Sequence, residues 1–193
     1  LGFRNQHLCI VFLLSLLMTA LCAAQTTSTF TDNFASGNYG GGAGWTGSWI
    51  DQESSLTLPT DGNIRVESGA VRLYQAVTGA GGLYRDFVVT QSSITTRTLT
   101  FSYRGNTGND SGVDLLVVEL STNGGGSYTQ LASLHSTSTS YVTSSTYTLS
   151  GITGPGTYRL RFRILDGTQT SEDYYFDNVT VTVTGPVPAA ATL

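Results

Sequence analysis

The stretch "GPGTYRLRFRI", Gly154 to Ile164, decides the fold class, because apolar and charged residues alternate along it one by one. A period of two is typical of a β-strand that buries one face and exposes the other. We therefore expect an inner row formed by Tyr158, Leu160, Phe162 and Ile164, and an outer row formed by Arg159, Arg161 and Arg163.

Short runs of the same kind continue along the chain, and clusters of Gly, Ser and Asn separate them. Residues 98–105, "TLTFSYRG", repeat the alternation, whereas residues 113–121, "VDLLVVELS", are apolar on both faces and indicate a central strand. Residues 63–75, "NIRVESGAVRLYQ", predict a hairpin with its turn at residues 67–69. After residue 24, no run of apolar residues with the helical spacing of 3.6 is long enough to predict a helix. The pattern predicts an all-β fold, an antiparallel β-sandwich.

The N-terminal segment has the character of a secretory signal. Residues 8–24, "LCIVFLLSLLMTALCAA", are an apolar run that follows Arg4 and His7 and ends in small residues. We predict a signal peptide at residues 1–24, a sandwich module at residues 25–184 and a linker-like tail at residues 185–193. The module is then expected outside the cell or on the cell surface, with no membrane insertion after signal cleavage and with tethering to further domains.

Composition narrows the function classes. Loss of residues 1–24 removes both cysteines, so the mature chain must rely on core burial or on a metal for stability. It has no lysine, and its net charge becomes −5, which argues against nucleic-acid and anionic-membrane partners. His135 is the one histidine left, so no Cys-His pair and no His-rich zinc site can form. We predict that the protein is not an enzyme; a glycan-active enzyme with paired carboxylates is a weaker alternative.

The alternation predicts two carboxylates on core-facing rows. Asp177 in "YYFDNVTVTV" is in register with the valines at 179, 181 and 183, and Asp32 lies between Phe30 and Phe34 in "TFTDNF". A buried carboxylate needs a cation, backbone donors or a proton. If the terminal strands are neighbours, Asp32 and Asp177 could share a Ca²⁺ ion, which Asp51 and Glu53 could join. Two alternatives remain. Each acid could lie at a strand end, at the solvated rim of the sandwich, and accept backbone N–H groups, or it could pair with an outer-row arginine.

Several motifs occur in a familiar order: "TDNFASG", "GWTGSW", "LTFSYRG", "VDLLVVELSTNGGGSYTQL", "YRLRFRI" and "EDYYFDNVTVT". Together they resemble the MAM-like, galactose-binding-like jelly-roll modules of bacterial exported proteins, over residues 28 to 184. The resemblance implies two antiparallel sheets packed face to face, binding rather than catalysis, and a structural Ca²⁺ where the first and last strands meet. By position its ligands would include Asp32 and Asp177, but Ala35 stands where the family has a glutamate.

Other residues suggest a ligand surface. Trp49, Tyr39 and Tyr84 could stack on sugar rings, and Arg159, Arg161 and Arg163 could bind a carboxylated or sulfated glycan. The arginines could instead pair with acids on neighbouring strands, such as Asp114 or Glu119. The leading interpretation is an exported, non-catalytic binding, adhesion or accessory module with a structural calcium site, whose partner is a glycan or a protein at the cell surface. The alternative is a carbohydrate-binding module.

Overall fold

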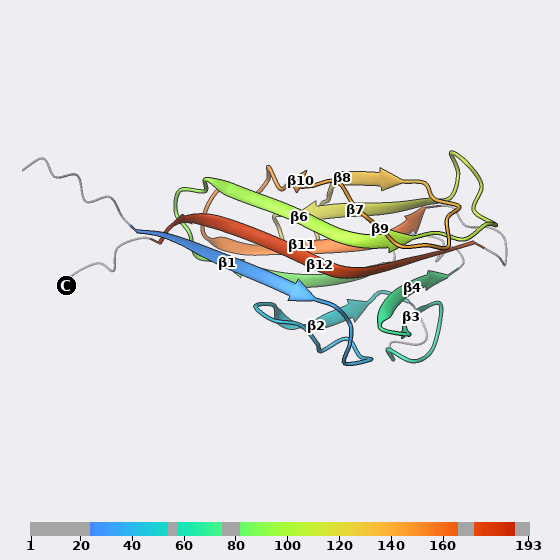
Figure 1. Ribbon diagram of the computed structural model, residues 1–193. Helices are drawn as coiled ribbons and strands as arrows, with labels where there is room; N and C mark the ends of the chain where they lie inside the picture. The colour runs from blue at the N-terminus through green and yellow to red at the C-terminus, as the bar shows by residue number, and fades with distance from the viewer. Residues whose placement is uncertain (1–23, 54–57, 75–81, 166–171, 188–193) are drawn as a thin grey trace, which may run out of the picture.

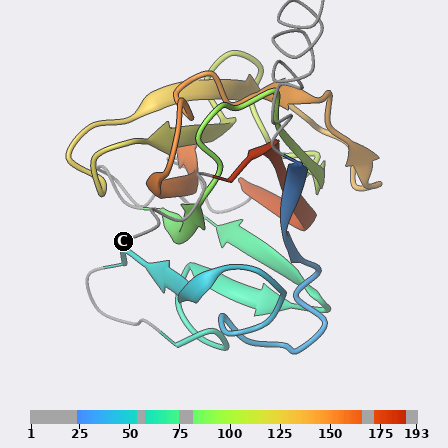
Figure 2. The same cartoon turned by 90° about the vertical axis from the view of Figure 1, so that its left-hand side faces the viewer.

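Strands account for all the regular structure in the part of the chain that the computed structural model describes, residues 24–53, 58–74, 82–165 and 172–187. They form two antiparallel sheets packed face to face, a β-sandwich of jelly-roll type (Figures 1 and 2). The predicted fold class is therefore confirmed. The predicted signal peptide lies outside the described residues, apart from its last residue. Among the described residues, no helix has the length and apolar character needed to cross a membrane.

The sheet that we call sheet A contains both terminal strands. Its hydrogen-bonded order is β10 (Tyr147–Thr148), β6 (Thr96–Arg104), β12 (Asp173–Pro186), β4 (Ala70–Tyr74) and β3 (Ile64–Glu67), while β1 (Gln25–Asp32) also pairs with β12 and β9 (Val142–Thr143) with β6. Sheet B has the order β2 (Thr46–Asp51), β5 (Leu83–Val89), β11 (Gly156–Leu165), β7 (Leu115–Ser121) and β8 (Thr129–Leu134). β12 continues two residues beyond the predicted module boundary at residue 184.

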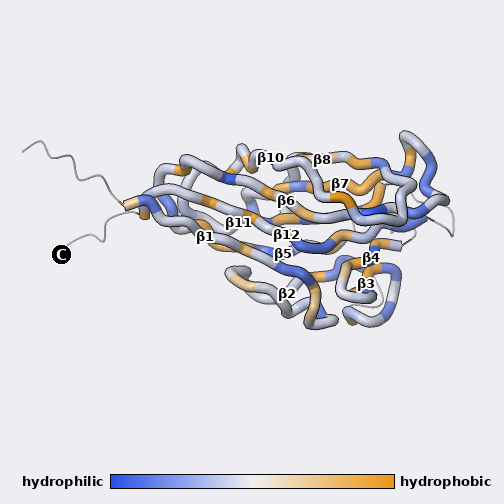
Figure 3. Tube along the Cα trace, viewed as in Figure 1, coloured by the Kyte–Doolittle hydropathy of each residue, from blue (hydrophilic) through white to orange (hydrophobic). Residues whose placement is uncertain are grey.

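The alternation in β11 positions the core. Its predicted inner row is buried, and the Phe162 ring stacks on the Phe176 ring of β12 with centroids 4.1 Å apart, which joins the two sheets. β7 is buried on both faces from Leu116 onward, as predicted for a central strand. Polar and apolar residues also alternate along β3, along the middle of β6 and along the later part of β12 (Figure 3). Burial of these inner rows is the main stabilising term available to a module without disulfides.

The terminal strands lie side by side, as the sequence predicts. β1 and β12 are antiparallel, with Asp32 opposite Val179 (Figure 1). The register of β12 against β6 shifts between Asp177 and Thr180, and Asn178 has a positive φ of 51°. This β-bulge adds one residue to the strand, so that Phe176 and Val179 both face the core. Asp177 is therefore not on the core-facing row, and that part of the prediction is wrong.

Candidate functional site

Asp32 is buried at the end of β1, but its charge is balanced by an arginine. Arg85 Nη1 of β5 lies 2.7 Å from Asp32 Oδ2, which also accepts a hydrogen bond of 2.9 Å from Trp49 Nε1. Asp32 Oδ1 accepts the backbone N–H of Phe34 at 2.9 Å. Arg85 thus supplies the positive charge that the sequence prediction assigned to Ca²⁺. The alternative that an arginine pairs with this acid is correct, but the arginine is Arg85 and not one of the outer-row arginines.

Asp177 is half-buried on the bulge. As in the predicted alternative, it accepts a hydrogen bond from a neighbouring backbone N–H group. Its two carboxylate oxygens accept hydrogen bonds from the backbone N–H of Asn178 at 2.6 Å and from Asn178 Nδ2 at 2.8 Å. Burial raises the pKa of Asp177, the Asn178 backbone N–H opposes that shift, and repulsion from Asp32 adds to it. An open pocket of about 450 Å³ lies beside the bulge; its lining is Thr31, Asp32, Asn33, Gly42, Ala43, Asn178, Val179 and Thr180.

Asp51 and Glu53 hold a neighbouring segment in place. Asp51 accepts hydrogen bonds from the Tyr39 hydroxyl at 3.2 Å and from the Glu53 backbone N–H at 2.7 Å. The Glu53 carboxylate accepts the backbone N–H groups of Asn63 and Ile64, at 2.8 and 3.0 Å. Burial raises the pKa of Asp51 to about 6. These contacts give both acids a structural role. None of these hydrogen bonds links Asp51 or Glu53 to Asp32.

Two of the three predicted platform residues are core residues. Trp49 is 2% exposed and packs against Phe34 and Phe162, and Tyr39 is 6% exposed with its hydroxyl donating to the Ile64 carbonyl at 2.7 Å. A ring with so little exposed area cannot stack on a sugar, so the platform prediction is wrong for both. Tyr84, the third residue, is half-buried on β5.

The outer-row arginines of β11 pair with acids on the neighbouring strands. Arg159 binds Asp86 of β5 through two hydrogen bonds, of 2.7 and 3.0 Å, and these bonds raise the pKa of the guanidinium. Arg161 and Arg163 both bind Glu119 of β7, with shortest distances of 2.7 and 3.1 Å. The predicted alternative of pairing with Glu119 is confirmed.

The other suggested partner of the arginines, Asp114, is elsewhere. It lies in the connection between β6 and β7, where its Oδ2 accepts the backbone N–H of Asp110. Asp86 was not identified from the sequence. The signal that would have found it is the pairing of β5 with β11, which sets Asp86 directly opposite Arg159.

Two tyrosines stack on these arginines. The Arg159 guanidinium carbon lies 3.7 Å from the centroid of the Tyr84 ring, and that of Arg161 lies 3.5 Å from the Tyr128 centroid. Tyr128 is the last residue of the hairpin loop before β8 and was not identified from the sequence. A tyrosine in a loop is not part of an alternating pattern, so the sequence does not show which way its side chain faces. Both tyrosines are half-buried.

Strand register builds these side chains into one surface. The pairings of Tyr84 with Arg161, Arg161 with Glu119, and Glu119 with Gln130 form a row across four strands. We call the surface the outer face of sheet B; its members are Tyr84, Asp86, Glu119, Tyr128, Gln130, Arg159, Arg161 and Arg163. Three arginines against two acids leave it with one excess positive charge, in a chain whose formal net charge is −4.

A second group of acids was also missed in the sequence. Asp110, Asp114 and Glu172 each place one carboxylate oxygen within 4.8 Å of the others. The first two are in one connection and the third precedes the last strand, so the folded topology brings together positions that are about sixty residues apart.

No protein-family model matches the chain, and no curated protein matches it either. Among solved structures, the chain is similar to a carbohydrate-binding module of family 29, with 10% sequence identity, coverage of 82% of this chain and 89% of that chain, and a TM-score of 0.48. A mutant of a family 29 module in complex with cellulohexaose has 12% identity, coverage of 82% and 91%, and a TM-score of 0.49. A mutant in complex with mannohexaose has 11% identity, coverage of 82% and 92%, and a TM-score of 0.45.

Proposed function

We propose that this protein is a non-catalytic glycan-binding module and that the outer face of sheet B is its binding surface. The observation that carries the proposal is the pair of stacks in which Arg159 lies over Tyr84 and Arg161 over Tyr128. The resemblance of the sequence to MAM-like modules supports a binding role. The apolar segment at residues 8–24 supports export, which would place this surface where extracellular glycans occur.

The surface offers the two kinds of contact that a sugar needs. The C–H face of a pyranose ring packs on an aromatic face, and its hydroxyls need both donors and acceptors. Tyr84 and Tyr128 supply the rings. The partly exposed guanidinium groups of Arg159 and Arg163 supply donors, Asp86 supplies acceptors, and the exposed Gln130 supplies both. The excess positive charge favours glycans that carry carboxylate or sulfate groups over their neutral counterparts.

The same ion pairs hold the surface in a fixed arrangement. Arg159 is held by two bonds to Asp86, and Glu119 is held by two arginines at once. Ordering a long side chain on binding costs about 0.5 to 1.5 kcal/mol, and a side chain that is already held avoids much of this cost. The face therefore meets a ligand with most of its polar groups in place.

Two other surfaces suit a glycan less well. The pocket beside the bulge has no aromatic residue in its lining. The outer side of sheet A has a second group of stacked rings, in which Arg104 lies between Tyr175 and Tyr141, but Tyr175 is buried. His135, the histidine among the described residues, contacts the backbone carbonyl of Asn109 at 3.3 Å, and the proposal gives it no catalytic step.

The test is binding to a panel of soluble polysaccharides, neutral and acidic, measured by affinity electrophoresis and by calorimetry on the hits. Tyr84→Ala and Tyr128→Ala should each weaken binding about tenfold or more, which is about 1.4 kcal/mol. Tyr141→Ala is the matched control, because it removes an exposed tyrosine next to an arginine on the opposite sheet. Failure to bind any glycan would contradict the proposal and leave protein contact or adhesion as the function to test.

A further inference from the structure

Three carboxylates converge where the connection between β6 and β7 meets the residue before β12. Asp110 and Asp114 lie in that connection, and Glu172 directly precedes β12. One oxygen from each lies within 4.8 Å of the other two. Asp114 is 0% exposed and Glu172 is 1% exposed, whereas Asp110 is open to solvent. The group therefore has a buried interior and one member at the surface.

One oxygen of Asp114 is buried and has no hydrogen-bond partner among the residues that the structure describes. Its Oδ2 accepts the backbone N–H of Asp110, while its Oδ1 is inaccessible to solvent and accepts no hydrogen bond from any described residue. An unsatisfied buried polar group costs about 1 to 3 kcal/mol, and more when it is charged. Two further carboxylates nearby add repulsion, which a cation would turn into attraction.

The positions of the three acids are fixed by other groups. The Asp114 N–H donates to the Asp110 carbonyl at 3.1 Å, a single helical turn that brings their side chains to one side. The Asn109 side chain bridges to the backbone of Asp173, donating to its carbonyl at 3.0 Å and accepting its N–H at 3.1 Å. The Tyr174 hydroxyl donates to the Asp114 carbonyl at 2.8 Å. These bonds hold the connection against the start of β12, and none of them uses the three carboxylates.

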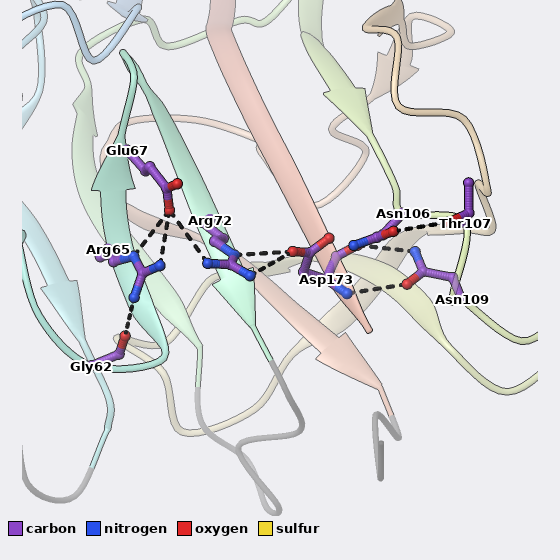
Figure 4. A network of polar contacts seen from close by, with 8 residues as sticks. All are labelled: Gly62, Arg65, Glu67, Arg72, Asn106, Thr107, Asn109 and Asp173. Atoms are coloured by element: carbon purple, nitrogen blue, oxygen red, sulfur yellow. Dashed lines mark hydrogen bonds and ion pairs between the residues drawn. The ribbon is translucent and has the colours of Figure 1, made fainter. Parts of the chain in front are cut away.

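The acid next to this group is already neutralised. Arg72 of β4 binds Asp173 at 2.9 and 3.0 Å, and Figure 4 shows Asp173 held between Arg72 and Asn109. Arg72 also contacts Glu67, so its charge is shared within sheet A. Asp173 is held by Arg72 and is not one of the three acids whose oxygens lie within 4.8 Å of one another.

We propose that Asp110, Asp114 and Glu172 form a calcium-binding site. Ca²⁺ binds oxygen ligands at about 2.3 to 2.6 Å, so two ligands of one ion lie up to about 5 Å apart, which the observed limit of 4.8 Å satisfies. The cluster contains no thiol and no imidazole, the ligands that zinc prefers. Mg²⁺ sheds its water reluctantly, and two buried carboxylates leave it little room to keep that water.

The site would join parts of both sheets. β6 belongs to sheet A and β7 to sheet B, so Asp110 and Asp114 lie on a crossover between the sheets, and Glu172 leads into β12 of sheet A. Calcium would lock this crossover onto the last strand. This inference concerns a different set of residues from the outer face of sheet B and is independent of the glycan proposal.

The test compares the full chain in EGTA and in CaCl2, with calorimetry for binding and scanning calorimetry for the melting temperature. Calcium should bind and raise the melting temperature, and an equal concentration of MgCl2 should raise it less. Asp114→Asn should abolish the rise yet leave the protein in EGTA at least as stable as the wild type. The reason is that the buried charge is gone, while the amide oxygen of the substituted side chain can still accept the Asp110 N–H.

Two further variants keep the outcome decisive. Asp110→Asn changes an exposed residue, so it should fold even if Asp114→Asn does not, and it should weaken calcium binding about tenfold or more. Asp177→Asn removes the acid of the bulge and should leave calcium binding unchanged. No calcium effect on the wild type, an effect that survives both Asp110→Asn and Asp114→Asn, or an effect lost in Asp177→Asn would each overturn the proposal.

Discussion

Arg85 Nη1 lies 2.7 Å from Asp32 Oδ2, in an ion pair whose two side chains are 4% and 0% exposed. It connects β5 of sheet B to the last residue of β1 in sheet A. Trp49 of β2 donates to the same oxygen, so one carboxylate ties together three strands from two sheets. A buried pair of this kind adds little net stability, but the loss of one partner is costly because it leaves the other charge alone in the core.

Arg85→Met should therefore lower the free energy of unfolding by about 3 to 5 kcal/mol. The double variant Asp32→Asn, Arg85→Met should lose less than the sum of the two single changes, because no charge remains unpaired. Urea denaturation measures all three. Arg65→Met is the matched control, since the pair of Arg65 with Glu67 is 32% and 42% exposed and should contribute less than about 1 kcal/mol. Equal costs for Arg85→Met and Arg65→Met would contradict the prediction.

Asp51 should make the protein less stable as the pH rises. Burial raises its pKa in the folded protein to about 6, against an ordinary value of 3.8, so the folded state binds the proton more tightly. The free energy of unfolding should fall through that window, by up to about 3 kcal/mol for a shift of about two pH units. Asp51→Asn should remove this fall, so its stability relative to the wild type should increase between pH 4 and 7.

Urea midpoints at several pH values would measure the effect of Asp51. Asp61→Asn serves as the control, because it replaces an exposed carboxyl instead of a buried one. A difference between Asp51→Asn and the wild type that stays constant with pH would show that the carboxyl of Asp51 does not titrate abnormally.

Glu119 should matter more for stability than its partner Arg163, whose side chain is 18% exposed. Removal of Glu119 takes away the carboxylate that lies 2.7 Å from Arg161, whose side chain is 7% exposed. Glu119→Ala should therefore cost about 3 to 5 kcal/mol. Arg163→Ala should cost about 1 kcal/mol, because the Glu119 carboxylate keeps its bond to Arg161. Chemical denaturation of both variants gives the comparison, and a larger cost for Arg163→Ala would contradict it.

Asn178 should tolerate glycine better than a branched side chain. Its φ of 51° is in the left-handed region, which costs most residues about 1 to 2 kcal/mol. Asn178→Gly should change the free energy of unfolding by less than about 0.5 kcal/mol, whereas Asn178→Val should lower it by about 1 to 2 kcal/mol. Thr182→Val, on the extended part of the same strand, is the control and should be nearly neutral. A loss in Asn178→Gly equal to that in Asn178→Val would rule out backbone strain as the cause.

The fold was predictable wherever alternation is unbroken. β11 shows its inner and outer rows directly in the sequence, and β7 shows its burial on both faces. The bulge at Asp177 and Asn178 was not predictable, because one added residue reverses the parity of everything after it and leaves no change in composition. The valines that follow were assigned correctly to the core. Asp177 was assigned to the core with them, because every second residue was counted as core-facing, and this assignment was wrong.

The site was harder to predict because pairing across the two sheets is invisible in a linear sequence. Glu119 was identified as a partner of the arginine row, yet Arg85 was missed as the partner of Asp32. Trp49 was suggested as a residue that stacks on sugar rings, although its indole N–H is bonded to Asp32 in the core. The Asp114 cluster depends on a contact between two distant segments, which alternation alone cannot reveal.

The most direct test of glycan binding by the outer face of sheet B is a backbone amide NMR titration with an oligosaccharide that the polysaccharide panel identifies. The account predicts that chemical-shift changes centre on Tyr84, Tyr128 and Arg161 and their neighbours on β5, β7, β8 and β11. Shift changes centred on the outer side of sheet A around Tyr141, or on the pocket beside Asn178, would contradict it.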